Sequence, residues 1–400
     1  METQSENRTQ AEDACCNNCG GRLSDSAYSA FDSVRGLSIH VCESCGLAQS
    51  LPRMEVGPKW KASTASGAGW GNIRYGKSFR TKFAINLLEK HTSLAALESV
   101  LDIGSNRGHF LETLRTRNRK ANLLGIEPDK TILGSDQRDE KLTILNDRIQ
   151  NVDLPGHAYD LIYCSHTLEH LADPASALRK AHDALTEQGL LYLEVPNINI
   201  ISNPSLIEEF FIDKHLYHYS PNTLHYLVSK SNFVPLELGF DDENIWVIAR
   251  KVLNDGAVDA NQDEPTEIKS LIARYASIIK KNRNEMKLVA RNIENLSKGT
   301  EIFIWGAGRI LDSLVTFGDF DVRLIGELID KKLVNYIPEV HGKKLSPPSV
   351  LMGNDDITLI VASRAYFNEI RSEAISLNPR IKDIRSIFDF FGTSEVLSIK

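Results

Sequence analysis

Two pairs of cysteines near the start of the chain have the spacing of a metal site. Each pair reads Cys-x-x-Cys and is followed directly by a glycine, Gly20 or Gly46. Glycine permits the tight turn that directs both sulfur atoms of a pair toward one ion, and four thiolates complete a tetrahedral, structural zinc site. The predicted ligands are Cys16, Cys19, Cys42 and Cys45. Cys15 is an alternative to Cys16, although it gives a less usual spacing.

A second set of chemically capable residues lies in the stretch FIDKHLYHYSP, residues 211–221. Two histidines and two tyrosines fall within five positions there, at His215, Tyr217, His218 and Tyr219. Such a cluster can transfer protons to and from a substrate, because imidazole titrates near neutral pH. It can equally be packing at the rim of a sheet, so its role depends on the elements around it.

The composition is that of a soluble globular protein. Hydrophobic residues make up 42% of the 400 positions and charged residues 25%, and this length suffices for two or three domains. The polar N-terminus lacks the apolar segment of a secretory signal, and no apolar run reaches the roughly 18 residues of a membrane helix. A net charge of −7 argues against a protein that mainly binds nucleic acid. We therefore expect a cytoplasmic protein without a nucleic-acid or membrane partner.

Four parts are predicted along this α/β chain. They are a zinc-binding module (1–60), a doubly wound domain (61–252), a linker with a long amphipathic helix (253–298) and a smaller Rossmann-like α/β domain (299–400). In the doubly wound domain, buried strands alternate with helices, as in a parallel sheet. The expected strands are 99–104, 122–128, 141–145, 159–164 and 190–197, a helix covers 174–188, and an antiparallel hairpin at 234–251 brings the sheet to seven strands.

The linker helix carries a heptad seam of about four heptads, because apolar residues recur at alternating steps of four and three. The seam consists of Ile268, Ile272, Tyr275, Ile279, Asn282, Met286, Val289, Ile293 and Leu296. The polar Asn282 can set the register of the helix against its neighbour. The seam can form a homodimer through residues 266–297 or pack within the chain, and packing within the chain is the favoured interpretation.

The loop after the first strand of the large domain is suited to a cofactor. It reads Asp102-Ile-Gly104-Ser-Asn106-Arg-Gly108, so its glycines let the backbone approach a ligand and present the amides of a helix N-terminus. The dinucleotide pattern G-x-G-x-x-G is absent, since the spacing is Asp-x-Gly-x-x-x-Gly. Glu127 ends the next strand, where a carboxylate can accept both hydroxyls of a ribose.

These residues resemble the class I methyltransferases that use S-adenosylmethionine. The loop is accompanied by GIEPD (125–129), YDLIYCSHTLEHLADP (159–174), the LYLEVPN strand and the terminal hairpin, so the resemblance covers about half of the chain. It implies S-adenosylmethionine as cofactor, with the methionine part near Asp102, the ribose at Glu127, and Asp147 or Arg148 near the adenine. The implied cofactor-binding residues are Asp102, Gly104, Asn106, Gly108, Glu127, Asp147 and Ser165. A nicotinamide-binding domain that has lost a glycine is the alternative.

The order of the four parts is similar to that of the C-methyltransferases of nucleotide-linked deoxysugars. The matching segments are CESCGLAQ (42–49), the methyltransferase core and IWGAG (304–308), and LIDKKLVNYIPEVHGKKLSPPSV (328–350) is a looser version of a phrase in that family. The resemblance implies a nucleotide-linked keto-deoxysugar that is methylated on carbon.

That family has a tyrosine, a glutamate and a histidine after the fifth strand, in a phrase like YHEHLxYFS. His215 matches the histidine, whereas Ile212 and Lys214 stand at the tyrosine and glutamate positions. The resemblance therefore implies His215 as the base, with His166 and Tyr217 as orienting or oxyanion groups. The two missing companions leave O-methylation open.

The other members of these motifs are expected to be structural: Glu169, His170, His218 and Tyr219. In the C-terminal domain, the Gly306-Ala307-Gly308 turn can hold a phosphate or only pack, and Leu311 stands where a dinucleotide site would have a third glycine.

Three other functions compete with sugar methylation: O- or N-methylation of another small molecule, a zinc-ribbon protein that binds or modifies RNA, and an interaction protein that assembles through the heptad helix.

Overall fold

The computed structural model describes residues 15–31, 33, 36–53, 77–129, 140–252 and 259–392. These residues form two compact units. Unit 1 contains the described residues of 15–53, 77–202 and 211–273, and unit 2 contains 203–210 and 274–392. The short segment 203–210 therefore belongs to unit 2, although the chain on both sides of it belongs to unit 1. The predicted boundaries at 60/61 and 252/253 fall in or beside segments outside the described residues.

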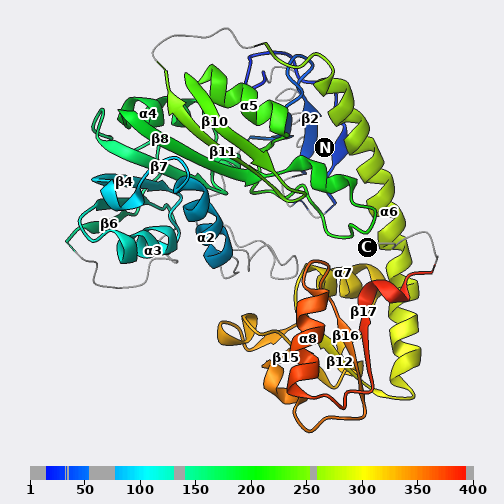
Figure 1. Ribbon diagram of the computed structural model, residues 1–400. Coiled ribbons are helices and arrows are strands. Elements are labelled where there is room, and N and C mark those ends of the chain that lie inside the picture. Colours follow the sequence, from blue (N-terminus) through cyan, green and yellow to red (C-terminus); the bar gives the residue numbers. More distant parts are fainter. Residues whose placement is uncertain are drawn as a thin grey trace. The chain divides into compact units, whose positions relative to one another are not determined.

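A seven-stranded sheet forms the centre of unit 1 (Figure 1). In sheet order its strands are β10 (Phe233–Phe240), β11 (Asn244–Lys251), β8 (Leu185–Pro196), β7 (Tyr159–Ser165), β4 (Ser99–Ile103), β5 (Asn122–Ile126) and β6 (Leu142–Leu145). β10 and β11 form an antiparallel hairpin, β11 is antiparallel to β8, and the other neighbours are parallel. The five parallel strands and the closing hairpin predicted from the sequence are thus present.

Helices cover both faces of this sheet. The helices of unit 1 are α2 (Lys77–Leu88), α3 (His109–Arg117), α4 (Pro174–Ala184) and α5 (Pro221–Lys230), with 3-10 turns η3 (Leu94–Ala96), η4 (Leu168–His170) and η5 (Ile198–Ser202). Figure 1 shows α2 and α3 on one side and α4 and α5 on the other. Adjacent residues of one strand join opposite cores: Val100 packs with the α2–α3 layer and Leu101 with the α4–α5 layer. This alternation is the period-two pattern of a strand buried on both faces.

The helix predicted over 174–188 is shorter in the structure, where α4 ends at Ala184. Leu185 instead begins β8: it pairs with Tyr159, and its carbonyl oxygen accepts a hydrogen bond of 2.6 Å from the Lys251 ammonium. The strand predicted at 190–197 is correspondingly longer at its N-terminal end. Long-range pairing has overridden the helical pattern of this stretch.

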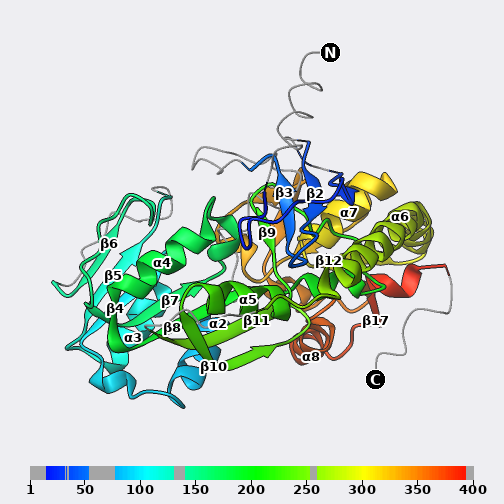
Figure 2. The same ribbon diagram turned by 90° about the horizontal axis from the view of Figure 1, so that it is seen from above.

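The N-terminal module of unit 1 forms a small antiparallel sheet. Its strands, in sheet order, are β1 (Tyr28–Ser29), β2 (Ser38–Val41), β3 (Ala48–Leu51) and β9 (Tyr217–His218). Figure 2 shows β2, β3 and β9 together. β9 lies far along the chain, in the histidine–tyrosine stretch, and pairs Ala48 with His218 and Gln49 with Tyr217. The sheet of the cysteine module is therefore completed by the segment that carries His215.

Unit 2 is a second α/β unit around a six-stranded sheet. In sheet order the strands are β14 (Glu339–Val340), β15 (Lys343–Ser346), β13 (Glu327–Ile329), β12 (Glu301–Trp305), β16 (Ile357–Val361) and β17 (Asp383–Ser386). Only the β14–β15 pair is antiparallel among these described strands. Numbered along the chain from β12, the parallel strands follow the order 3-2-1-4-5, which is the Rossmann-like order and is the same as for β4 to β8 in unit 1.

The helices of unit 2 also lie on both faces of its sheet. They are α7 (Arg309–Gly318) and α8 (Phe367–Leu377), with the 3-10 turns η6 (Val322–Leu324), η7 (Leu333–Asn335), η8 (Pro348–Leu351) and η9 (Ile387–Phe390). α7 packs with the last turns of α6 (Glu264–Ser297) against one face, and α8 packs against the other. Among the described residues, no helix combines the length and apolar character needed to cross a membrane.

The predicted long helix is α6, and its seam is buried within the chain. Every seam residue from Ile268 to Ile293 is at most 5% exposed, and Leu296 is partly buried. The side-chain amide of Asn282 donates two hydrogen bonds of 2.8 Å, to the backbone carbonyls of Pro204 and Leu206. Asn282 therefore sets the register of α6 against segment 203–210.

Charged side chains of unit 2 bind the same segment. The Arg364 guanidinium contacts the Glu208 carboxylate at 2.8 Å, and the Tyr275 hydroxyl donates to the Glu209 carboxylate at 2.6 Å. Glu208 is largely removed from solvent, which would raise its pKa, but Arg364 outweighs this effect and holds the pKa of Glu208 at about 2. Because buried charges of this kind are costly when separated, they fix the segment firmly to unit 2.

Replacing Asn282 by Ala is expected to destabilise unit 2 by about 1–3 kcal/mol, because two buried carbonyl groups lose their donors. Asn284→Ala is the matched control, because Asn284 is exposed on the same helix. This change brings the same gain in helix propensity, so the stability of this variant should be unchanged or slightly higher. Urea unfolding of both variants measures the difference. Equal midpoints for the two would contradict the anchoring role of Asn282.

Candidate active site and cysteine cluster

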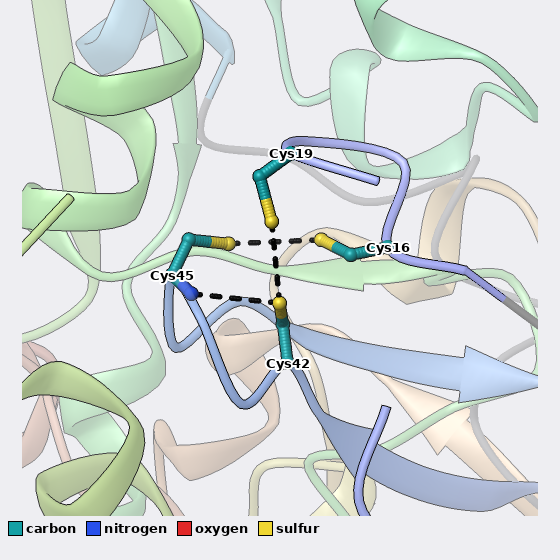
Figure 3. A group of neighbouring side chains, drawn as sticks. All are labelled: Cys16, Cys19, Cys42 and Cys45. Atoms are coloured by element: carbon teal, nitrogen blue, oxygen red, sulfur yellow. Dashed lines mark hydrogen bonds between the residues drawn. The ribbon is translucent and has the colours of Figure 1, made fainter. Parts of the chain in front are cut away.

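The four predicted cysteines converge on one point (Figure 3). The Sγ atoms of Cys16 and Cys45 lie 3.6 Å apart and those of Cys19 and Cys42 lie 3.4 Å apart, and all four sulfurs lie within 4.8 Å of one another. In a tetrahedral zinc site with Zn–S bonds of about 2.3 Å, the sulfurs are about 3.8 Å apart. The donor set therefore fits a zinc ion. Cys15 is exposed and outside the cluster, which selects Cys16 over its neighbour.

Two equivalent turns create this cluster. In each turn a glycine amide donates to the carbonyl of the first cysteine: Gly20 to Cys16 at 2.8 Å and Gly46 to Cys42 at 3.0 Å. Both glycines have a positive φ, of 73° and 77°. Residues with a Cβ rarely adopt this backbone conformation. The turns also direct backbone amides at the sulfurs, as Cys45 N–H does toward the Cys42 sulfur at 3.4 Å. The local sequence therefore organises the site for thiolates.

Four sulfurs at these distances compete for protons. Hydrogen bonding with Cys16 lowers the pKa of Cys42 and brings that of Cys19 down to about 7, whereas hydrogen bonds with Cys19 and Cys42 raise the pKa of Cys16. A bound divalent cation would stabilise all four thiolates together and remove this competition.

The carboxyl edge of the large sheet carries the glycine loop. It follows β4 directly, and Gly104 and Gly108 have φ of 77° and 78°. A Cβ on Gly104 would lie 1.9 Å from the Thr167 hydroxyl, so only glycine fits where this loop meets the one after β7. Asn106, between the two glycines, also has a positive φ of 51°. Asp102 lies within β4 and is 2% exposed. These features hold the loop amides close to the sheet edge, where a ligand can contact them.

Glu127 connects the glycine loop to the end of β5. One of its carboxylate oxygens accepts the Asn106 amide at 2.8 Å and the other accepts the Asp129 amide at 2.9 Å. Each oxygen retains acceptor capacity for a ribose hydroxyl. Asp147 follows β6 and is exposed, with one oxygen accepting the Arg148 amide. The cofactor-binding residues proposed from the sequence thus line the ends of neighbouring parallel strands.

Beside this edge lies a cluster of two buried carboxylates and three partly buried histidines. His166 follows β7 with a positive φ of 49°. Its Nδ1 lies 3.6 Å from Glu169 Oε1 and its Nε2 lies 3.7 Å from Glu194 Oε1. Ser165, at the end of β7, donates to the other Glu194 oxygen at 2.9 Å. The rings of His170 and His215 lie 4.9 Å apart. The cluster adjoins the cofactor loop through Thr167, which meets Gly104.

Burial and charge set the protonation of this cluster. Burial would raise the pKa of Glu169, but nearby His170 and His166 outweigh it and hold that pKa at about 2. Burial, with His170 beside it, keeps the pKa of His215 well below its ordinary value. Burial and Arg80 also lower the pKa of His166, yet Glu169 and Glu194 outweigh them and leave it raised. Glu169 is therefore ionised at neutral pH, and His166 is a better proton acceptor than His215.

The remaining residues of the histidine–tyrosine stretch belong to the small sheet. The Tyr217 hydroxyl donates to the Ala172 carbonyl at 2.7 Å, and its ring is 1% exposed. His218 Nε2 lies 2.9 Å from the Ser50 hydroxyl, and burial lowers the pKa of His218 to about 3. His218 and Tyr219 are 3% and 0% exposed, so the expectation that these two pack is confirmed.

Sequence reasoning did not single out Glu194, and it assigned Glu169 and His170 to the scaffold. Glu194 is the one charge in the apolar run LLYLEVP of β8, and it is 3% exposed. A lone acidic residue near the carboxyl end of a buried strand is costly unless it serves a site, and this signal could have identified it.

A sequence model described as "Methyltransferase domain" matches residues 77–238, from the start of α2 into β10. Residues 77–238 are thus similar to a methyltransferase domain. The strand order of the sheet and the glycine loop at its edge are consistent with this similarity. The glycine loop and Glu127 lie within the matched residues and are suited to hold S-adenosylmethionine.

Two curated relatives match part of this chain over part of their own length. A "tRNA U34 carboxymethyltransferase" of Sulfurimonas denitrificans is 29% identical over 121 residues, and one of Sulfurovum sp. is 28% identical over 122 residues. Each alignment covers 29% of this chain and 40% of the relative.

Solved structures of methyltransferases are also similar. An S-adenosylmethionine-dependent methyltransferase from Archaeoglobus fulgidus is 17% identical, with a TM-score of 0.37, over 46% of this chain and 97% of its own. One from Mesorhizobium loti is 18% identical, with a TM-score of 0.35, over 42% of this chain and 96% of its own.

For the cysteine cluster, Cys16→Ser is expected to reduce the zinc content from one ion per chain to well below one. The same change should lower the melting temperature by about 5 °C or more, because metal binding contributes to folding. Cys15→Ser is the matched control and should retain both values. Metal analysis and thermal unfolding give the result, and loss of zinc in the Cys15 variant instead would reverse the ligand assignment.

For the cofactor edge, Glu127→Ala is expected to weaken binding of S-adenosylhomocysteine by about tenfold to a hundredfold, since charge-assisted hydrogen bonds to the ribose are lost. Calorimetric titration measures this. Glu187→Ala, which removes an exposed carboxylate at the far end of β8, should bind as the parent chain does. An unchanged affinity of the Glu127 variant would remove this residue from the cofactor site.

Proposed function

We propose that the enzyme transfers a methyl group from S-adenosylmethionine to a small, hydroxylated, carbohydrate-like acceptor, and that this acceptor is a nucleotide-linked sugar. The observation that carries the proposal is the cluster of His166, Glu169, Glu194 and His215 beside the glycine loop, in which both carboxylates are buried. These groups offer proton acceptors and hydrogen-bond acceptors next to the loop that we propose holds the cofactor.

The chemistry of methyl transfer explains why such a cluster is useful. The electron pair of the acceptor attacks the methyl carbon, the carbon–sulfur bond breaks, and the sulfonium becomes the neutral thioether of S-adenosylhomocysteine. A neutral acceptor must also lose a proton, and we assign its removal to the imidazoles of this cluster, His166 and His215. Tyr217 supports β9 in this proposal, because its hydroxyl is bonded to a backbone carbonyl.

The charge of the cluster favours a hydroxylated acceptor over a phosphate backbone. Glu169 and Glu194 are 1% and 3% exposed, and both have a lowered pKa. Buried, ionised carboxylates repel a phosphate at the methylated position and accept hydrogen bonds from hydroxyls there.

Unit 2, taken by itself, contains an arrangement suited to a nucleotide. The turn after β12 contains Gly306 and Ala307, and Asp330 follows β13. The Asp330 carboxylate accepts the Ala307 amide at 3.3 Å, just as Glu127 accepts the Asn106 amide in the methyltransferase domain. This repeated arrangement of glycine turn and carboxylate is suited to a nucleotide.

RNA modification is the second candidate function, because both curated relatives named above are tRNA U34 carboxymethyltransferases. Their similarity is confined to 29% of this chain. A tRNA substrate would have to approach an edge lined by acidic groups, which is the physical reason we rank it second.

The test offers labelled S-adenosylmethionine with a panel of nucleotide-linked sugars and, separately, with unmodified tRNA. We expect label transfer to a sugar, and tighter binding of S-adenosylhomocysteine when a nucleoside diphosphate is present. Label transfer to tRNA alone would establish the second candidate instead. If S-adenosylhomocysteine does not bind to folded, zinc-containing protein, the methyltransferase assignment itself fails.

The role of the cluster is tested by His166→Ala, which should lower kcat about a hundredfold or more while the affinity for S-adenosylhomocysteine stays the same. His225→Ala is the control, because His225 is exposed on α5, away from the cluster. A normal kcat for the His166 variant would exclude this imidazole as a proton acceptor.

A further inference from the structure

Three side chains of the histidine–carboxylate cluster, one of them buried, are arranged as metal ligands. Glu169 and His170 lie in the η4 turn, and His215 precedes β9. One ligand atom from each of these three residues lies within 4.8 Å of the others. Two imidazoles and one carboxylate are a common ligand set for divalent transition metals, and they leave positions open for water or substrate. The four-cysteine site differs, since its coordination is filled by protein.

The Glu169 carboxylate points into this site without a hydrogen-bond donor. It is 1% exposed, and neither of its oxygens has a hydrogen-bond partner. Its nearest imidazole nitrogens, on His166 and His170, are 3.6 and 3.8 Å away, beyond hydrogen-bonding distance. A buried carboxylate without donors is costly unless a cation compensates for it. Nδ1 of His215 is also buried without a partner.

The tautomer of His170 is fixed in the form that a metal ligand needs. Its Nδ1 lies 2.7 Å from the Lys214 carbonyl oxygen. Because a carbonyl oxygen can only accept a hydrogen bond, Nδ1 carries a proton, and in the neutral imidazole Nε2 then keeps its lone pair. Nε2 is the nitrogen that faces Glu169. Hydrogen bonding of the second ring nitrogen to a backbone carbonyl is the usual support of metal-ligating histidines.

From these contacts we propose that Glu169, His170 and His215 bind a divalent cation on the acceptor side of the cofactor edge. The proposal rests on the proposed function and deepens it. Three protein ligands leave room for oxygen atoms of the acceptor, so the substrate class becomes one with neighbouring hydroxyl groups, and the methylated atom becomes an oxygen. In this arrangement His215 is a ligand, and His166 takes the proton.

The methyl transfer is then balanced. A hydroxyl of the acceptor, made more acidic by the cation, loses its proton to His166. The oxygen forms a bond to the methyl carbon, and the electron pair of the broken carbon–sulfur bond stays on sulfur. The products are the O-methylated acceptor, S-adenosylhomocysteine and a proton that His166 passes to solvent, to which its side chain is 21% exposed.

The experiment uses the full chain with zinc in its cysteine site and titrates it with Mn²⁺, followed by the paramagnetic resonance signal of free Mn²⁺. Thiolates prefer zinc, whereas carboxylate-containing sites accept manganese, so the titration reports the second site alone. We expect one Mn²⁺ per chain, and affinity reduced about tenfold or more in both Glu169→Gln and His170→Gln. His166→Gln should keep Mn²⁺ binding and lose turnover.

Affinity for S-adenosylhomocysteine serves as the folding control for each variant and should be unchanged. If the parent chain takes up no Mn²⁺, or if Glu169→Gln binds it equally well, the cation site is overturned. Methyl transfer to a sugar at full rate without added divalent ions would also overturn it, while leaving the proposed function standing. Failure to bind S-adenosylhomocysteine would instead remove the function on which the site depends.

Discussion

The pairing of β3 with β9 is the interaction on which the proposed acceptor side of the candidate active site depends. Beyond the two paired residues of β9, Ser50 donates from its amide to the Leu216 carbonyl at 2.9 Å and from its hydroxyl to the His215 carbonyl at 2.8 Å. β3 begins just after the second cysteine turn, so the backbone around His215 is held by the cysteine module. Zinc in the four-cysteine site would therefore stabilise the geometry of a site to which it contributes no ligand.

The small sheet also fixes the segment that carries His215. Residues 217–218 form the fourth strand of that sheet, directly after His215 in the chain. The position of His215 therefore depends on contacts with the cysteine module, outside the seven-stranded sheet. The cofactor loop is different, because its glycines and Glu127 are positioned by neighbouring strands of that sheet alone.

This difference explains what the sequence can and cannot predict. The glycine loop, Glu127 and the cysteine turns are local patterns of glycine, charge and spacing, and each has a direct structural meaning. The buried face of α6 could also be predicted, since burial of one helix face imposes a regular spacing of apolar residues. The pairing of β9 with β3 could not be predicted, because a strand of two residues has no periodic pattern and its partner lies far away in the chain. The buried position of Glu169 follows from that pairing, since the amide of Leu216 donates to its carbonyl.

The assignment of residues 203–210 to unit 2 also limits how such an enzyme can diversify. The C-terminal domain could not easily be exchanged by itself. Arg364 and Asn282 bind residues 203–210, and that segment lies within residues 77–238, which match the methyltransferase model. Segment 203–210 and the C-terminal domain would have to change together, because their contacts include charged side chains on both sides. This part of the fold is therefore inherited as a matched pair of segments that lie far apart in the sequence.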